Sequence, residues 1–266
     1  MQEDVINAVM KEVMKRVGGE ESPAEAAPAC EAPACASDIA LTEFVGTGLG
    51  ETQGIVIANL DPAIHEIMGL DKKFRSIGVI GARVGAGPQL MAADEAIKAT
   101  NTEILSVELP RDTKGGAGHG SLIIFGAEDV SDARRAVEVT LDSLPQYFGD
   151  VYANDQGHLE LQYTARASKC ISTTFNAPEG KAFGLILGAP AVIGVMMIDT
   201  AVKSADVDVV GYGSPTNGTA NSNEVFITVS GDSGAVRQAV IAGREIGKQL
   251  LGAWGQPPAP VATPYI

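Results

Sequence analysis

From residue 41 onward the sequence repeats itself, and this repeat constrains the fold more than any other feature of the chain. Three pairs of segments align at shifts of 103, 105 and 103 residues, which place Gly54 over Gly157, Lys98 over Lys203 and Arg134 over Arg237. Because the shift changes by only two residues over a whole unit, the pattern indicates a tandem duplication rather than a solenoid of short repeats. We therefore predict two similar domains, at residues 41–145 and 146–253, followed by a C-terminal tail at 254–266.

Each unit has the pattern of alternating strands and helices. In the first unit GIVIANL, RSIGVIGA, EILSVEL and SLIIFG are typical of strands. Asp61 before Pro62 is typical of a helix start, and Pro88 opens a second helix that ends near residue 100. A third helix is predicted from the apolar stripe Val130, Ala133, Val137, Leu141 and Leu144, which the second unit repeats as Val236, Val240, Gly243, Gly247 and Leu250. The predicted fold class is α+β, with a mixed sheet covered by helices in each domain.

The N-terminal residues 1–18 have the spacing of an amphipathic helix. Its apolar stripe consists of Val5, Ile6, Val9, Met10, Val13, Met14 and Val17. Residues 19–40 are rich in proline, alanine and glutamate and predict a flexible linker. A helix at the end of a linker cannot bury its stripe alone, so we expect it to dock on another protein, with packing on its own domain as the alternative.

The charge balance excludes several classes of partner. Acidic residues outnumber basic ones by 33 to 19, which gives a formal net charge of −14. Nucleic acid and anionic membrane surfaces would repel such a chain. No apolar run is long enough to cross a bilayer, and the first residues are unlike a signal peptide, so we expect a soluble cytoplasmic protein. Of the three cysteines, Cys30 and Cys35 lie in the predicted linker and are expected to be unpaired thiols.

The glycine-rich segment RDTKGGAGHGS, residues 111–121, matches no phosphate-binding or catalytic motif. A P-loop places its lysine after the glycines and opens a helix, whereas here the lysine comes first and a strand follows. A catalytic interpretation would use His119 with Asp112, but the aligned loop at 214–223 has no titratable side chain. The turn GARVGAGP, residues 81–88, has the wrong spacing for a dinucleotide fingerprint and is predicted to be structural.

No zinc signature, nucleophile motif or paired-carboxylate motif occurs in the sequence, so we expect no cofactor, no metal and no enzymatic activity. Surface positions are the default expectation for the three histidines, His65, His119 and His158.

The segment AVKSADVDVVGY, followed by a polar loop and VFITVSGDSGAVRQAV, resembles the central part of bacterial microcompartment shell domains. In this chain the strand pair that closes an ordinary shell domain comes first, as GIVIANL before RSIGVIGA, which is similar to the circularly permuted, tandem class of the family. The resemblance extends from Leu41 to about Gly252. It implies a homotrimer whose six domains form a pseudohexameric tile in the shell of a cytoplasmic protein organelle.

The resemblance also implies where the functional residues lie. By position, two loops match the family's pore loop, and their residues are Arg111, Asp112, Lys114, Gly115, Gly116, Gly118 and His119 in the first and Ser214, Pro215, Thr216, Asn217, Gly218 and Asn221 in the second. Three copies of each loop around an axis would form a selective or gated pore for small polar metabolites such as glycerol, propanediol or an aldehyde. Lys98 and Lys203 match the lysine at the tile edge, where other shell proteins pack laterally. Arg166 is a poor match for the arginine that accompanies this lysine in the family.

The N-terminal helix is then expected to attach encapsulated enzymes. Two alternatives remain open. In the first alternative, the chain is a small-molecule binding or sensing module that uses the cleft between the duplicated domains. In the second alternative, it is an enzyme that uses His119 and Asp112.

Overall fold

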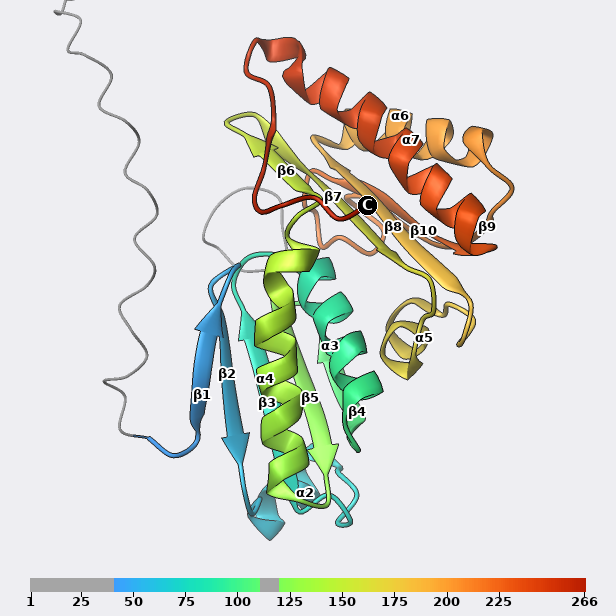
Figure 1. Cartoon of the computed structure of the whole chain (residues 1–266). Coiled ribbons are helices and arrows are strands. Elements are labelled where there is room, and N and C mark those ends of the chain that lie inside the picture. Colours follow the sequence, from blue (N-terminus) through green and yellow to red (C-terminus); the bar gives the residue numbers. More distant parts are fainter. Residues whose placement is uncertain (1–40, 111–119) are drawn as a thin grey trace, which may run out of the picture. The chain divides into compact units, whose positions relative to one another are not determined.

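Two successive sets of strands and helices occur in the same order along the chain (Figure 1). The computed structural model describes residues 41–110 and 120–266. The first domain comprises β1 (Phe44–Gly48), β2 (Thr52–Ile57), α2 (Pro62–Met68), β3 (Ser76–Ala82), α3 (Gly87–Ala99), β4 (Glu103–Glu108), β5 (Ser121–Ala127) and α4 (Val130–Tyr147). The second domain comprises β6 (Val151–Asn154), β7 (Gly157–Thr164), α5 (Lys169–Phe175), β8 (Ala182–Ala189), α6 (Ala191–Ser204), β9 (Asp208–Gly213), β10 (Val225–Gly231) and α7 (Ser233–Leu251).

The predicted duplication and the α+β class are therefore confirmed. The division at residues 145 and 146 stays a prediction, and α4 continues through Pro145 to Tyr147. The predicted N-terminal helix and linker lie outside the described residues.

Each domain contains one sheet, with the strand order β1-β2-β3-β5-β4 in the first and β11-β6-β7-β8-β10-β9 in the second. The expected mixed sheet needs correction, because every strand pair in the described part of the chain is antiparallel. Helix α3 joins β3 to β4, and these two strands run in the same direction. However, β5 lies between them and pairs antiparallel with both, so the helical crossover creates no parallel pair.

The structural repeat differs from the sequence alignment at the start of each unit. Gly78 on β3 and Gly184 on β8 lie at the same place, because they face the equivalent valines of α4 and α7. The strand partner of Gly78 is Val56 on β2, and the strand partner of Gly184 is Tyr163 on β7. The shift between β2 and β7 is therefore 107 residues, from Val56 to Tyr163, and the alignment of Gly54 with Gly157 is wrong by four residues. The misalignment has a local cause. Both glycines follow a glutamine in the sequence, but Gly54 lies inside β2 whereas Gly157 begins β7.

Helix caps extend this equivalence to the helices. Asp61 and Ser168 are the N-caps of α2 and α5, and each side chain accepts a hydrogen bond from the backbone N–H two residues later. The shift is 107 residues for this helix pair. Helices α3 and α6 end at Ala99 and Ser204, a shift of 105 residues. Equivalent residues of the two domains are called counterparts below.

The predicted helix stripes are largely buried. In α4 the side chains of Ala133, Val137 and Leu144 face the first sheet, whereas Val130 at the first turn is exposed, contrary to the prediction. In α7 Val236, Val240, Gly243 and Gly247 are buried as predicted, and Leu251 rather than Leu250 completes the buried stripe.

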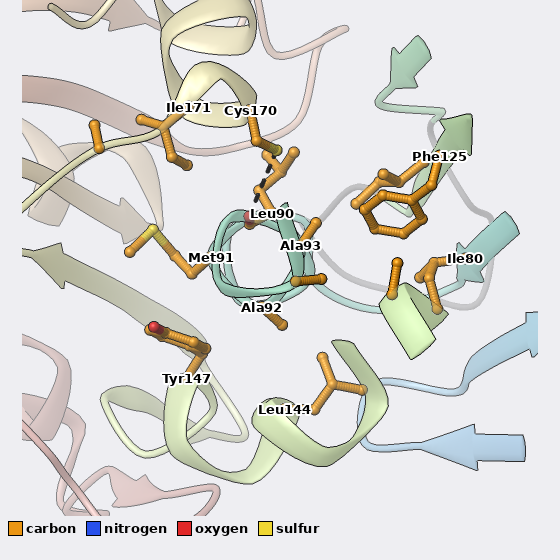
Figure 2. Packing of buried hydrophobic residues seen from close by; sticks show 14 of the residues in the cluster. Ile80, Leu90, Met91, Ala92, Ala93, Phe125, Leu144, Tyr147, Cys170 and Ile171 are labelled. Atoms are coloured by element: carbon orange, nitrogen blue, oxygen red, sulfur yellow. Dashed lines mark hydrogen bonds between the residues drawn. The ribbon is translucent and has the colours of Figure 1, made fainter. Parts of the chain in front are cut away.

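A hydrophobic core joins the two domains (Figure 2). Leu90 and Met91 of α3 pack with Cys170 and Ile171 of α5, and all four side chains are fully buried. The Cys170 thiol lies 3.8 Å from the Leu90 carbonyl oxygen, as the dashed line in Figure 2 marks. Buried Asp94 of α3 accepts a hydrogen bond of 2.9 Å from the Ser168 N–H and a second from the Ser168 hydroxyl. We call this contact between α3 and α5 the internal seam.

The C-terminal segment folds back on the second domain. The short turn η2 (Gly252–Trp254) leads to β11 (Ala259–Pro260), which pairs with β6. Asp150 is fully buried and accepts hydrogen bonds from the backbone N–H groups of Tyr265 and Ile266, at 2.8 and 3.0 Å. Arg244 of α7 forms an ion pair of 2.8 Å with Asp150. These contacts fix the segment against the start of the second domain.

Candidate functional site

The loop between β9 and β10 is held together by its own hydrogen bonds. Ser214 and Asn217 exchange backbone hydrogen bonds of 2.8 and 2.9 Å, and the Thr219 hydroxyl donates to the Ser214 carbonyl at 2.8 Å. Gly218 and Asn221 have positive φ angles of 92° and 65°, which glycine and asparagine adopt readily. The side chains of Thr216, Asn217 and Asn221 are exposed. The loop therefore presents uncharged polar groups on a defined backbone.

The counterpart loop between β4 and β5 contains the predicted charged pore residues. Residues 111–119 lie outside the described residues, so Arg111, Asp112, Lys114, Gly115, Gly116, Gly118 and His119 have no structural outcome. At the ends of this loop the Gly120 N–H donates to the Pro110 carbonyl at 2.8 Å. The loop therefore leaves and re-enters the sheet at one place.

Lys98 and Lys203 are counterparts in different surroundings. Lys98 Nζ lies 2.8 Å from Asp94 Oδ2 and 2.9 Å from Glu95 Oε1, and its side chain is 29% exposed. Burial opposes the charged form, but the hydrogen bonds to Asp94 and Glu95 outweigh it, so the pKa of Lys98 is raised. Lys203 forms an ion pair of 2.7 Å with Asp199, and its side chain is 72% exposed. Lys203 therefore presents its ammonium group to solvent far more than Lys98 does.

Arg166, a poor match for the family's edge arginine in the sequence, lies near the predicted edge lysine of the first domain. It belongs to the segment between β7 and α5, and it lines the same surface hollow as Lys98 of the first domain. The two cationic side chains therefore come from different domains. A search for the arginine within the same sequence unit as the lysine does not find Arg166 for Lys98, because these two residues line one hollow only when the two domains pack together.

An apolar face of α6 is exposed. Val195 is 53% exposed, whereas its counterpart Leu90 on α3 is 0% exposed. Met196 is likewise exposed, and its counterpart Met91 is buried in the core between the domains. The difference arises because α5 covers α3, and no element of the described chain covers α6 in the same way.

Helix α2 carries the matching apolar face. Ile64, Ile67 and Met68 are exposed, and Ile67 is the most exposed of them at 82%. The counterparts of Ile64 and Met68 on α5 are Ile171 and Phe175, which pack into the core between the domains. The two halves of the internal seam, α3 and α5, therefore have counterparts, α6 and α2, that remain open in one chain.

A cavity of about 330 Å³ lies between the two domains. The predicted turn GARVGAGP contributes one wall, and a Cβ atom at Gly87 would collide with the Glu160 carboxylate. Most of the lining is apolar and includes Val84, Leu185, Leu187, Phe226 and Val261.

The ionisable side chains in the cavity are His158, Glu160 and Glu224. His158 Nε2 lies 4.0 Å from Glu224 Oε2. Burial lowers the pKa of His158, and the nearby Glu224 carboxylate opposes that shift. The sequence prediction missed this group because His158 and Glu160 on β7 meet Glu224, which lies just before β10, only in the folded chain. The available signal was a histidine and an acid at alternate positions of the strand GHLELQY, which places them on one face.

Two histidine predictions need correction. His65 is buried, with Nε2 2.8 Å from the Phe74 carbonyl oxygen, and His158 lines the cavity, so neither has the expected surface position. Cys170 is a buried free thiol whose pKa is raised by burial. Among the described residues, no group of three histidine, cysteine or acidic side chains could hold a metal ion, and no helix is long and apolar enough to span a membrane.

A family model described as the BMC domain matches residues 76–155 and 182–257, which together make up more than half of the chain. The chain belongs to the BMC-domain family. The two matches cover corresponding parts of the two domains, so the recognition made from the sequence is confirmed for both copies.

Relatives within the family match over almost their full length. Bacterial microcompartment shell protein PduB of Citrobacter freundii is 56% identical over 266 residues, which covers 99% of this chain and 98% of that protein. The crystal structure of a trimeric bacterial microcompartment shell protein PduB has 52% identity and a TM-score of 0.82, and covers 85% of this chain and 100% of the other. EtuB from Clostridium kluyveri has 56% identity and a TM-score of 0.83, with 85% and 99% covered. The chain is therefore a microcompartment shell protein with tandem BMC domains.

Of the sites predicted from the sequence, the structure describes the second loop and both lysines that are predicted to lie at the tile edge. The predicted cargo-docking residues, Val5, Ile6, Val9, Met10, Val13, Met14 and Val17, lie outside the described residues. The sequence analysis named a cleft between the domains as an alternative site, but it predicted no individual residues for this cavity.

Proposed function

We propose that this chain forms a trimeric, pseudohexameric shell tile with a central pore, and that it has no catalytic turnover. One observation carries the proposal: the helix faces that build the internal seam are exposed on their counterparts. Helix α3 is covered by α5 within the chain, so α6 needs an equivalent cover. The α2 helix of a second copy supplies it, because α2 is the counterpart of α5 and has an open apolar face.

This pairing is head to tail. The second domain of one copy contacts the first domain of the next, so each copy uses α6 with one neighbour and α2 with another. All of these faces are covered only if the arrangement closes into a ring. The crystal structure of a trimeric relative at 52% identity supports closure with three copies. Burial of the exposed valine, isoleucine and methionine side chains on both helices provides the driving force.

The assembly test uses a charge on α2. Ile67→Asp places a carboxylate where the proposed interface is apolar, so trimers should be lost or weakened at least about tenfold, as measured by mass photometry over a dilution series. Leu41→Asp is the control, because Leu41 is also exposed but lies outside both helices. Trimers of equal stability in the two variants would contradict the proposal.

The pore proposal places the two polar loops, residues 111–120 and 214–223, around the trimer axis. The self-contained hydrogen bonds of the second loop support it, because a rigid uncharged rim can offer hydroxyl, amide and backbone groups to glycerol, propanediol or an aldehyde. The charged residues of the first loop are proposed as the gate. Shells with Asn217→Asp should admit neutral propanediol and exclude small anions more strongly than wild-type shells do.

Lys98 and Lys203 are proposed to lie at the tile edge, where other shell proteins bind laterally. The hollow shared by Lys98 and Arg166 supports this assignment. Arg166→Ala removes an exposed charge without disturbing the internal seam. It should weaken extended sheets in electron micrographs while the mass of the trimer stays the same. Unchanged sheets would count against the edge assignment.

The N-terminal helix is proposed to attach encapsulated enzymes, on the basis of its apolar stripe and the linker that follows. Deletion of residues 1–37 should release cargo from purified shells, and full retention of cargo would remove this proposal.

The cavity between the domains favours a second candidate function, the binding of a small amphiphilic molecule by each chain. Its apolar walls and its His158 and Glu224 groups support it. Saturable binding of propanediol by chains that never assemble laterally would favour this function over the shell tile.

A further inference from the structure

The internal seam contains a charge cluster whose counterpart is open in one chain. Asp94 and Lys98 on α3 form an ion pair of 2.8 Å, and Asp199 and Lys203 on α6 form the same pair at 2.7 Å. Both pairs have a four-residue spacing in the last two turns of their helices. The two lysines therefore start from the same position and the same first partner.

In the internal seam Lys98 has several oxygen partners. Besides Asp94, its ammonium group contacts Glu95 at 2.9 Å and lies 3.5 Å from the Thr164 hydroxyl of the second domain. The Ser168 hydroxyl at the start of α5 donates to Asp94 from the other side of the seam. The Asp94 carboxylate thus has one cation and one neutral cap as its partners.

The counterparts of these partners differ in a consistent way. By the shifts established above, Glu95 corresponds to Thr200, Thr164 to Ile57, and Ser168 to Asp61. Lys203 therefore lacks the second acid and the hydroxyl that Lys98 contacts. The N-cap that faces the aspartate changes from a hydroxyl to a carboxylate.

We infer that Lys203 of one copy bridges its own Asp199 and Asp61 of the next copy at the outer end of the seam between copies, where this seam reaches the proposed tile edge. This inference rests on the proposed trimer and names the contact that holds α2 of one copy against α6 of its neighbour. One Asp61 oxygen caps α2 by accepting from the Ala63 N–H at 2.8 Å, and the second oxygen is available for the ammonium group. In the internal seam Glu95 is the second acid beside the lysine. In the seam between copies, Asp61 of the neighbouring copy takes this role.

The nearby carboxylates make the charge of Lys203 necessary for the contact between copies, although its side chain is exposed in one chain. Without its ammonium group, Asp199 and Asp61 would face each other as two carboxylates, in a chain whose formal net charge is already −14. In the internal seam the Ser168 hydroxyl avoids this repulsion. The contact between copies therefore depends on the lysine charge, and the internal seam has a neutral donor as well.

The experiment measures how fast labelled copies exchange between trimers of the full chain. Lys203→Met keeps the aliphatic stem and removes the charge, so exchange should accelerate about tenfold or more relative to wild type. Lys72→Met is the matched control, since Lys72 is exposed on the loop after α2 and should change the rate less than about twofold. Adding Asp61→Asn to Lys203→Met removes the opposed carboxylate and keeps the helix cap, so it should restore most of the wild-type rate.

The inference is overturned if Lys203→Met behaves like Lys72→Met, or if Asp61→Asn fails to rescue it. Either result, with wild-type trimers present, would leave the proposed shell tile intact. If the wild-type chain forms no trimers at all, the proposed function fails and this inference fails with it.

Discussion

His158 is a residue whose chemistry is altered by its position in the fold. Its ring lines the cavity between the domains and lies near the Glu224 carboxylate, but burial has the larger effect and lowers its pKa. Sequence analysis expected a surface position, because a single histidine in a strand carries no signal of the wall that another domain will build against it. Its neighbours in the cavity come from residues 84–87 and 224–226, which no local pattern connects.

The lowered pKa predicts a pH dependence of stability. In the unfolded chain His158 takes up a proton below its ordinary pKa of about 6.5, whereas the folded chain resists protonation. The unfolded state is therefore favoured as the pH falls through about 6.5, and stability is regained above it. In His158→Gln the free energy of unfolding should fall less between pH 7 and pH 5 than in wild type, as measured by urea denaturation. An identical pH dependence in both proteins would contradict this assignment.

At the scale of helices and strands, local signals predicted the elements well, and contacts between elements were predicted poorly. The pair Asp61 and Pro62 predicted the start of α2, because an N-cap and a proline at the first helical position act through the local backbone. Antiparallel pairing throughout the described strands was not predicted, because the insertion of β5 between β3 and β4 is a property of the whole sheet. The start of the repeat was misaligned by four residues for the same reason: strand register is decided by cross-strand partners.

Helix α6 approaches β8 and the start of β10 so closely that only glycine fits at one position. A Cβ atom at Gly194 would lie 2.5 Å from the Val225 carbonyl oxygen and 2.7 Å from the Gly188 carbonyl oxygen. Gly194→Ala should therefore lower the free energy of unfolding by about 2 kcal/mol, despite the higher helix propensity of alanine. Gly234→Ala in α7 is the control, because its Cβ atom would meet only the Asp232 side chain, at 3.3 Å. Equal stability of the two variants in urea denaturation would contradict the close approach.

At the scale of the whole molecule, the duplication in the sequence predicts two domains, and the structure adds an imbalance between them. The first domain's α3 is covered by α5, whereas α6 in the second domain and α2 in the first remain exposed. Sequence alone could not assign these faces, because Leu90 and Val195 are equally apolar and differ only in what covers them. An open pair of faces with a covered counterpart is the strongest reason in this chain to expect a closed ring of copies.

The most direct test of this account is a cross-link between the two open faces. Ala63 and Val195 are the counterparts of Cys170 and Leu90, whose thiol and carbonyl oxygen lie 3.8 Å apart in the internal seam. In a chain with Cys30→Ser and Cys35→Ser, the double variant Ala63→Cys and Val195→Cys is treated with a short bismaleimide. The head-to-tail ring predicts covalent trimers on a denaturing gel, and each single variant should give none. Double-variant chains that stay monomeric, or that stop at dimers, would contradict the ring.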